Sequence, residues 1–185
     1  GRVDMLINSG GISQRSAIID TDISVDRKII EIDYLGTIAL TKALLPHFVT
    51  QNKGHFVVVS SLMGKFSSPL RSAYCAAKHA LHGFFDALRA EHEKDNIHVS
   101  LICPGYIKTK ISFNALMGDG SKQNTMDKAQ DNGMSPQRCA SKIIKAIEQN
   151  KNEVYIGGFK EVAGIYLKRF FPNLFAKVVI KMAVT

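Results

Sequence analysis

Hydrophobic and polar positions along the chain form two kinds of segment that alternate. Short, almost continuous apolar runs cover residues 3–8, 55–60, 98–103 and 153–156, which is typical of strands buried on both faces of a sheet. Longer segments, in which apolar residues recur at helical spacing, lie between these runs. Strands that alternate with helices in this way predict an α/β protein with a doubly wound, mainly parallel sheet.

Local signals predict where several elements begin and end. Ser24 is a suitable N-cap for the first long helix, and Pro46 should kink or end that helix. Ser135 and Pro136 open a later helix, with serine as the N-cap and proline at the first helical position. Residues 110–134 are polar and rich in Gly, Asn and Asp, so we expect a mobile loop with partial helix.

The composition is that of one globular domain. The 185 residues leave room for a sizeable core, with 45% hydrophobic and 22% charged residues. The cysteines Cys75, Cys103 and Cys139 are widely spaced, which favours free thiols in a reducing compartment over a disulfide framework or a zinc site. His79 and His82 share a helical flank, but no acidic or cysteine partner accompanies them. We therefore expect packing or surface roles for both and predict no metal site.

Positive charge is concentrated toward the C-terminus. The formal net charge is +8, and from Ser135 onward nine lysines and arginines face three acidic residues. This excess indicates an anionic partner, either a phosphate-bearing cofactor or a lipid surface. Nucleic acid is not expected, because no recognised binding motif accompanies the charge. Neither a signal peptide nor an apolar run of membrane-spanning length is present, so we expect a cytoplasmic protein or one at the cytoplasmic face of a membrane.

Three residues in one stretch indicate proton-transfer chemistry. Tyr74 and Lys78 fall at i, i+4 spacing, so their side chains leave one face of the predicted helix. A free phenol has a pKa of about 10, and a nearby ammonium favours the phenolate, which makes a phenol more useful as an acid or base at neutral pH. Ser61 follows the preceding strand and could hold a carbonyl or alcohol beside the phenol. The alternative is a structural serine cap and a surface Tyr/Lys pair.

Several segments, in this order, resemble the classical short-chain dehydrogenase/reductases. MLINSGGIS is similar to that family's strand and Asn-Asn-Ala-Gly turn, and HFVVVSS is similar to the strand that ends in its catalytic serine. Tyr74 follows Ser61 by 13 positions, the spacing that the family shows, and CPGYIKT is similar to its Pro-Gly turn and threonine. The resemblance extends from about residue 3 to residue 158 and implies a Rossmann-like fold. It is nearest to a membrane-associated dehydrogenase/reductase branch, because of an SRS-like loop and a basic, aromatic C-terminal tail.

The resemblance implies a catalytic role for four residues. Tyr74 would be the general acid/base, Lys78 would bind the nicotinamide ribose, and Ser61 would orient the substrate oxygen. Asp33 stands where the family has an asparagine that supports a water relay. A carboxylate keeps two acceptors but loses both amide donors, so this departure affects the water relay and leaves the proton-transfer residues in place.

The resemblance also implies a cofactor site for NAD or NADP. Its residues would be Asn8, Gly11, Tyr74, Lys78, Pro104, Gly105, Ile107 and Thr109. The Ile107 backbone and the Thr109 hydroxyl would hold the nicotinamide carboxamide, and a simple turn after the strand is the alternative. Asn8 would contact the adenosine ribose or would only support its turn, because that turn departs from the family pattern at its second and third residues.

One part of the family's pattern has no counterpart in the sequence. The family begins with a strand, a glycine-rich turn and a helix that receive the cofactor pyrophosphate. The chain therefore resembles the C-terminal two-thirds of a longer protein, which we expect to be inactive alone, and nothing in it separates NAD from NADP. We divide it into residues 1–158, a catalytic domain without its N-terminal βαβ part, and residues 159–185, a basic amphipathic tail.

The tail allows two interpretations. In residues 160–185, apolar residues recur near helical spacing between basic ones, with an interruption at Pro172, which is typical of a helix at a membrane interface. Alternatively, the apolar face closes the substrate cleft or packs against the sheet.

Two functions fit these observations. The first is an oxidoreductase that transfers hydride between NAD(P)(H) and a hydrophobic carbonyl or alcohol, with Arg71, Ser72 and residues 113–117 facing the substrate. The second is a catalytically inactive protein of the same fold that acts through interactions or at a membrane surface. The family resemblance also implies a homodimer at full length, in which the helices 26–45 and 74–93 pair with their copies across a two-fold axis.

Overall fold

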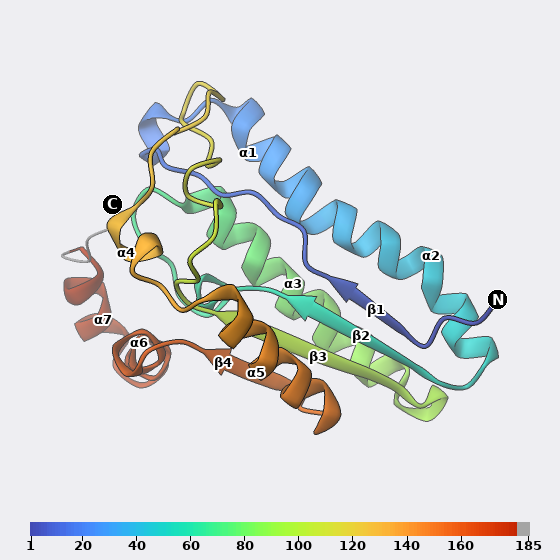
Figure 1. Cartoon of the computed structure of the whole chain (residues 1–185). Coiled ribbons are helices and arrows are strands. Elements are labelled where there is room, and N and C mark those ends of the chain that lie inside the picture. Colours follow the sequence, from blue (N-terminus) through green and yellow to red (C-terminus); the bar gives the residue numbers. More distant parts are fainter. Residues whose placement is uncertain (181–185) are drawn as a thin grey trace.

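A computed structural model describes residues 1–180 and places a parallel four-stranded sheet between two layers of helices (Figure 1). Strands β1 (Met5–Asn8), β2 (Gly54–Val59), β3 (Ile97–Pro104) and β4 (Glu153–Ile156) lie side by side in chain order. Every neighbouring pair is parallel, so each connection crosses from one end of the sheet to the other. This arrangement confirms the predicted α/β fold class.

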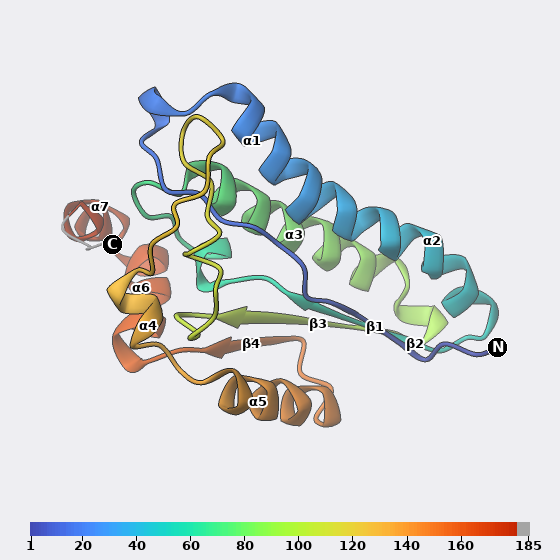
Figure 2. The same cartoon turned by 45° about the horizontal axis from the view of Figure 1, so that its top comes forward.

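Long helices cover one face of the sheet. Helix α1 (Ile23–Ile30) continues through a π-helical segment, Glu31–Leu35, into α2 (Gly36–Thr50), so the three form one long rod (Figure 1). Helix α3 (Ser72–Glu91) lies beside this rod against the sheet. Helix α5 (Pro136–Glu148) covers the opposite face, as Figure 2 shows.

The remaining helices lie beyond the carboxyl ends of the strands. These are α4 (Lys128–Asp131), α6 (Phe159–Phe170) and α7 (Pro172–Val179). In Figure 2 they lie at the arrowhead end of β3 and β4, together with the long connection that follows β3. Ligand sites of parallel α/β folds form at this edge, because the connecting loops gather there.

Both faces of the sheet are packed with apolar side chains. Phe56 and Val58 of β2 belong to a buried cluster with Phe85 of α3, whereas Val57, between them in the chain, packs with Ile156 of β4 in a cluster that includes residues of α5. Successive side chains of a strand point to opposite faces. The unbroken valine run of β2 therefore has a packing partner on either side.

One predicted helix start was wrong, one is confirmed, and Pro46 does not end its helix. The N-cap of α1 is Asp22, whose side chain accepts a hydrogen bond from the Ser24 N–H at 2.7 Å, so the helix begins before Ser24. Pro46 lies inside α2, which continues to Thr50. Proline has no N–H to bond the carbonyl one turn earlier in the helix. Because Pro46 is exposed, water can bond this carbonyl instead. Ser135 caps α5 as predicted, by accepting from the Arg138 N–H.

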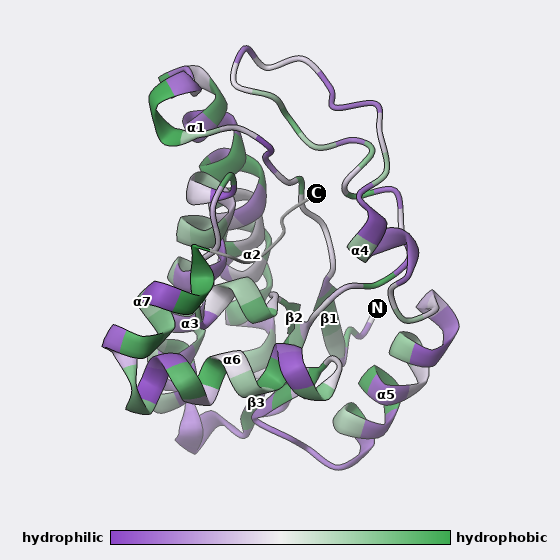
Figure 3. Ribbon diagram, turned by 90° about the vertical axis from the view of Figure 1, so that its left-hand side faces the viewer, coloured by the Kyte–Doolittle hydropathy of each residue, from purple (hydrophilic) through white to green (hydrophobic). Residues whose placement is uncertain are grey.

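The C-terminal tail forms two helices that pack on one side only. Ile165 of α6 and Phe175 of α7 are buried in a cluster with Phe66, and the rings of Phe66 and Phe175 lie 5.5 Å apart. The outer surface of both helices alternates between hydrophobic and hydrophilic residues (Figure 3). No helix within residues 1–180 is long and apolar enough to cross a membrane. Lys181 and Met182 of the predicted tail pattern lie outside the described residues.

Candidate active site

A cavity of about 330 Å³ opens at the carboxyl ends of β2 and β3. Six of the residues predicted for the site line it: Ser61, Tyr74, Pro104, Gly105, Ile107 and Thr109. They come from the end of β2, from α3 and from the connection after β3, so the fold brings together segments that are up to 48 positions apart. Most of the remaining wall is apolar and includes Leu62, Met63, Phe66, Ile111 and Ile143.

Ser61 is held where β2 ends. Its side chain caps a short 3₁₀ turn, Leu62–Gly64, by accepting from the Met63 N–H at 3.1 Å. Its hydroxyl donates to the carbonyl of Pro104 at 3.4 Å, which ties the end of β2 to the end of β3. The serine is therefore a positioned cavity residue and also a cap, so the two interpretations of this residue do not exclude each other.

Tyr74 and Lys78 lie one turn apart on α3, and both are buried. The Lys78 ammonium lies 5.5 Å from the centre of the Tyr74 ring. The same ammonium forms an ion pair with Asp33, at 3.3 Å, from the π-helical segment between α1 and α2. These contacts rule out the alternative of a solvated Tyr/Lys pair on the helix surface.

Asp33 is fully buried and faces two donors. One carboxylate oxygen accepts from the Ile12 N–H at 2.7 Å, and the other faces Lys78. Burial raises the pKa of Asp33 above its usual range, against the lowering effects of Lys78 and the Ile12 N–H. A Cβ atom at Gly11 would come within 3.0 Å of this carboxylate and 3.1 Å of the ammonium. Gly11, at φ +156°, therefore allows the backbone to close over the pair.

The other predicted residues occupy different positions. Asn8 is buried and its amide donates to the Thr41 hydroxyl at 3.2 Å, so its side chain contacts α2. Arg71 lines the cavity, as expected for a residue facing the substrate. Ser72 and residues 113–117 are not among the described residues that line it. Instead, Ser72 Oγ accepts from Gln14 at 3.4 Å, away from the cavity wall.

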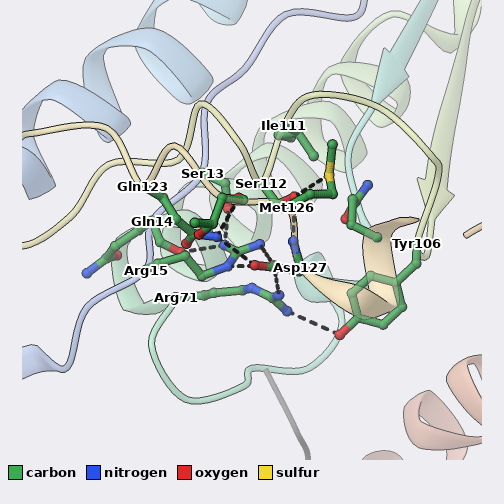
Figure 4. A network of polar contacts seen from close by, with 12 residues as sticks. Ser13, Gln14, Arg15, Arg71, Tyr106, Ile111, Ser112, Gln123, Met126 and Asp127 are labelled. Atoms are coloured by element: carbon green, nitrogen blue, oxygen red, sulfur yellow. Dashed lines mark hydrogen bonds and ion pairs between the residues drawn. The ribbon is translucent and has the colours of Figure 1, made fainter. Parts of the chain in front are cut away.

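A buried polar network fixes the long connection after β3 against this wall (Figure 4). Asp127 accepts from Arg15 at 2.6 Å and from Arg71 at 3.3 Å, and Arg71 also donates to the Tyr106 hydroxyl. The other carboxylate oxygen accepts from Gln123 at 2.7 Å. The predicted partial helix in residues 110–134 is α4, and Arg15 holds this segment from 112 positions away in the chain.

Sequence reasoning missed Glu161, a residue of α6 that lines the cavity. Its carboxylate accepts from the Tyr106 N–H at 3.3 Å, and a Cβ atom at Gly105 would lie only 1.7 Å from it. Gly157 is constrained in the same way, at 2.8 Å. The glycines that follow β3 and β4 thus leave room for the Glu161 carboxylate. Helix α6 of the tail therefore contributes directly to the cavity. The only signal in the sequence was a carboxylate in an otherwise basic tail.

Comparisons with known proteins agree with this geometry. The sequence model of the short chain dehydrogenase family matches residues 1–117. A curated relative, dehydrogenase/reductase SDR family member 7B of Xenopus laevis, is 46% identical over 178 residues, which are 96% of this chain and 55% of that protein. The chain thus spans just over half the length of this relative.

Solved structures show the same fold. A short chain dehydrogenase from Burkholderia cenocepacia in complex with NADP superposes with a TM-score of 0.79 over 96% of this chain and 69% of that one, at 22% identity. A short chain dehydrogenase/reductase from Burkholderia phymatum in complex with NAD gives 0.79 over 94% and 67%, at 18% identity.

The parallel sheet and the cavity at its carboxyl edge define a Rossmann-like protein. The chain belongs to the short-chain dehydrogenase family. Within that family, it is similar to the branch that contains family member 7B.

Proposed function

We propose that this chain forms the catalytic part of an NAD(P)-dependent oxidoreductase for a hydrophobic carbonyl/alcohol pair. The observation that carries the proposal is the shared cavity: Ser61 and Tyr74 open onto the same mostly apolar space as the Pro104–Gly105 turn and Thr109. A protein that kept the fold for interactions alone would have no need to hold these polar groups around one space. The proposal therefore favours the enzyme over the inactive alternative.

Pro104, Gly105, Ile107 and Thr109 would hold the nicotinamide. These residues fit the nicotinamide, because they line the same cavity as Ser61 and Tyr74. The bound cofactor supplies or accepts the hydride. NADP and NAD occur in the two related structures named above, and the proposal covers either cofactor.

The protein's own groups handle the proton. Tyr74 gives its phenolic proton to the carbonyl oxygen during reduction and takes it back during oxidation. Ser61 donates a hydrogen bond to the same oxygen, and its cap interaction with Met63 keeps the hydroxyl in place. Lys78 supplies a positive charge beside the phenol, and Asp33 holds that ammonium in position.

Substitution of Tyr74 tests the mechanism. In a chimaera that carries a relative's N-terminal segment before Gly1, Tyr74→Phe should lower the rate by about 10²–10⁴-fold, since the ring remains and the proton is lost. Tyr106→Phe is the matched control, because Tyr106 also lines the cavity and should keep most of the rate. An unchanged rate in Tyr74→Phe, measured by NAD(P)H absorbance, would exclude the mechanism. Ser61→Ala should lower turnover, whereas Lys78→Met should also weaken cofactor binding.

We also propose that the outer face of α6 and α7 contacts the anionic cytoplasmic face of a membrane. Ile165 and Phe175 face inward, which fits the packing interpretation of the tail. The same helices expose large apolar side chains and carry basic ones between them: Phe159, Tyr166, Phe170, Phe171, Leu174 and Val178, with Lys160, Lys168, Arg169 and Lys177. Exposed aromatic groups bordered by positive charge bind anionic lipid interfaces.

Vesicle sedimentation tests this contact. The chain should bind phosphatidylserine-containing vesicles more strongly than neutral ones, and Phe170→Ser with Phe171→Ser should remove most of the binding. Both side chains are more than 60% exposed, so the fold should not depend on them. Ile144→Ser on α5 is the matched control. Equal binding of the double variant and the control would refute the contact.

A further inference from the structure

A second cluster of chemically versatile side chains lies beneath α3, outside the residues that line the cavity. It consists of His82 on α3, Cys103 on β3 and Glu153 on β4. The strand register places Leu101 beside Glu153 and Cys103 beside Tyr155, so Cys103 and Glu153 point to the same face of the sheet. His82 meets both of them from the helix above.

The donor atoms of these three residues converge. Cys103 Sγ lies 3.7 Å from His82 Nε2, and Glu153 Oε2 lies 3.6 Å from His82 Nδ1. One ligand atom from each residue can be chosen so that all lie within 4.8 Å of one another. In a tetrahedral zinc site, bonds of about 2.0–2.3 Å place neighbouring ligand atoms about 3.3–3.8 Å apart. Because a histidine offers one nitrogen to one ion, the imidazole must rotate to bring the same nitrogen to both partners, and the carboxylate must move closer, to reach coordination distance.

The hydrogen bonding of His82 also indicates a metal site. Its side chain is 8% exposed, and its Nδ1 has no hydrogen-bond partner among residues 1–180. A buried polar atom without a partner is costly, and a metal ion would satisfy it. We propose that His82, Cys103 and Glu153 bind a zinc ion, with a water molecule in the fourth position.

The donor types of the cluster suit a divalent cation. His82 offers an imidazole nitrogen, Cys103 a sulfur and Glu153 a carboxylate oxygen, and zinc sites in proteins are built from these three kinds of ligand. On binding, Cys103 releases its thiol proton to solvent, and bonds form from zinc to sulfur, nitrogen and oxygen without any change of oxidation state.

Lys65 competes with the ion for Glu153. Its ammonium lies 2.7 Å from Glu153 Oε2, and both side chains are about a quarter exposed, which gives the ion a route from solvent. Zinc must displace this ammonium. The site also adjoins the active site, because His82 Nε2 lies 3.2 Å from the hydroxyl of Ser60, which precedes Ser61. On the proposed function, an ion that turns His82 away from Ser60 would lower turnover, but binding itself does not depend on that function.

Titration of the chain with cobalt(II), followed by displacement with zinc, tests the proposal. Cobalt should bind at one equivalent with a thiolate-to-metal absorption band, and zinc should abolish the band. Cys103→Ser should remove the band and weaken zinc binding at least about tenfold, whereas Cys139→Ser, a buried thiol outside the cluster, should change neither.

Lys65→Met provides a test that does not disturb the buried ligands. Removal of the competing ammonium should tighten zinc binding several-fold, while circular dichroism checks that each variant is folded. The absence of a band in the unsubstituted chain, a band that persists in Cys103→Ser, or zinc affinity in Lys65→Met that is unchanged or weaker would each overturn the proposal.

Discussion

Asp33 is the point at which the site departs most from the pattern that it resembles. Its carboxylate is buried beside Lys78 and held by the Ile12 N–H. The π-helical segment adds one residue to a helical turn and so turns this side chain toward α3. Because Asp33 neutralises part of the Lys78 charge, the ammonium acts less strongly on Tyr74 than it would beside a neutral asparagine.

Asp33→Asn should therefore change the pH dependence of the reaction. With the carboxylate removed, the Lys78 charge is no longer compensated, so the pH profile of alcohol oxidation in the chimaera should move to lower pH. Asp131→Asn, which removes an exposed aspartate that pairs with Lys108, is the control and should leave the profile in place. A profile that does not move in Asp33→Asn would show that Asp33 has no electrostatic influence on the phenol.

His55 links stability to pH. Burial, and next the neighbouring His98, lower the pKa of His55, which pairs with the Ser100 hydroxyl at 2.9 Å. The unfolded chain takes up a proton near pH 6.5 while the folded chain does not, so stability is present above that pH and falls below it. Between pH 7.5 and 5, His55→Gln should reduce the slope of the unfolding free energy by at most about 1.4 kcal/mol per pH unit. Urea unfolding at a series of pH values measures the slope, and a slope that is the same in His55→Gln would contradict the assignment.

Sequence patterns identify some site residues well and others not at all. Tyr74 and Lys78 share a helix, and Ser61 precedes them by a spacing that can be read directly. Asp127 and Glu161 carry no such signal, because their partners are remote: Arg15 is 112 positions from Asp127, and Tyr106 is 55 from Glu161. Only the folded topology brings these pairs together. The three residues of the proposed zinc site, on three different elements, are hidden for the same reason.

At the scale of elements, apolar period and capping signals predicted the order of strands and helices correctly. The errors concern helix ends, where alternatives differ by little energy. Asp22 and Ser24 are both good caps, and the chain uses the carboxylate. Pro46 costs less than its usual penalty at an exposed position of α2, because water can reach the carbonyl that lost its donor. Tertiary packing of the neighbouring turns then decides that the helix continues.

Helix α7 depends on a single buried ring, which makes its docking testable. Phe175 is 7% exposed and packs edge-on against Phe66. Phe175→Ala should destabilise the chain by about 3–5 kcal/mol and speed amide exchange in α7, since a buried ring is lost. Phe171→Ala removes a ring that is 61% exposed and should have little effect on either measurement. Equal losses in both variants would mean that α7 is not docked through Phe175.

At the scale of the whole molecule, the exposed apolar surface is divided among distinct regions. One is the tail, and another is the outer face of the α1–α2 rod, where Ile32, Leu35 and Leu40 are exposed. The neighbouring α3 exposes the small residues Ala76, Gly83, Ala87 and Ala90, together with Asp86 and Glu91. Large apolar groups beside a row of small ones form a self-complementary surface, which is what a two-fold interface requires.

We predict that this helical face forms a closed dimer. A second route to association exists, because β1 has no partner on its outer side within residues 1–180 and its Ile7 is 51% exposed. Strand pairing at such an edge is open to aggregation, whereas a two-fold helix interface stops at two copies. Substitution of Leu40, whose side chain is 60% exposed on the helical face, distinguishes the two routes of association. Light scattering should therefore find that Leu40→Lys converts dimers to monomers, while Ile144→Lys on α5 leaves them intact. If Leu40→Lys leaves the mass distribution unchanged, association occurs through β1 or another surface and the helical dimer is wrong.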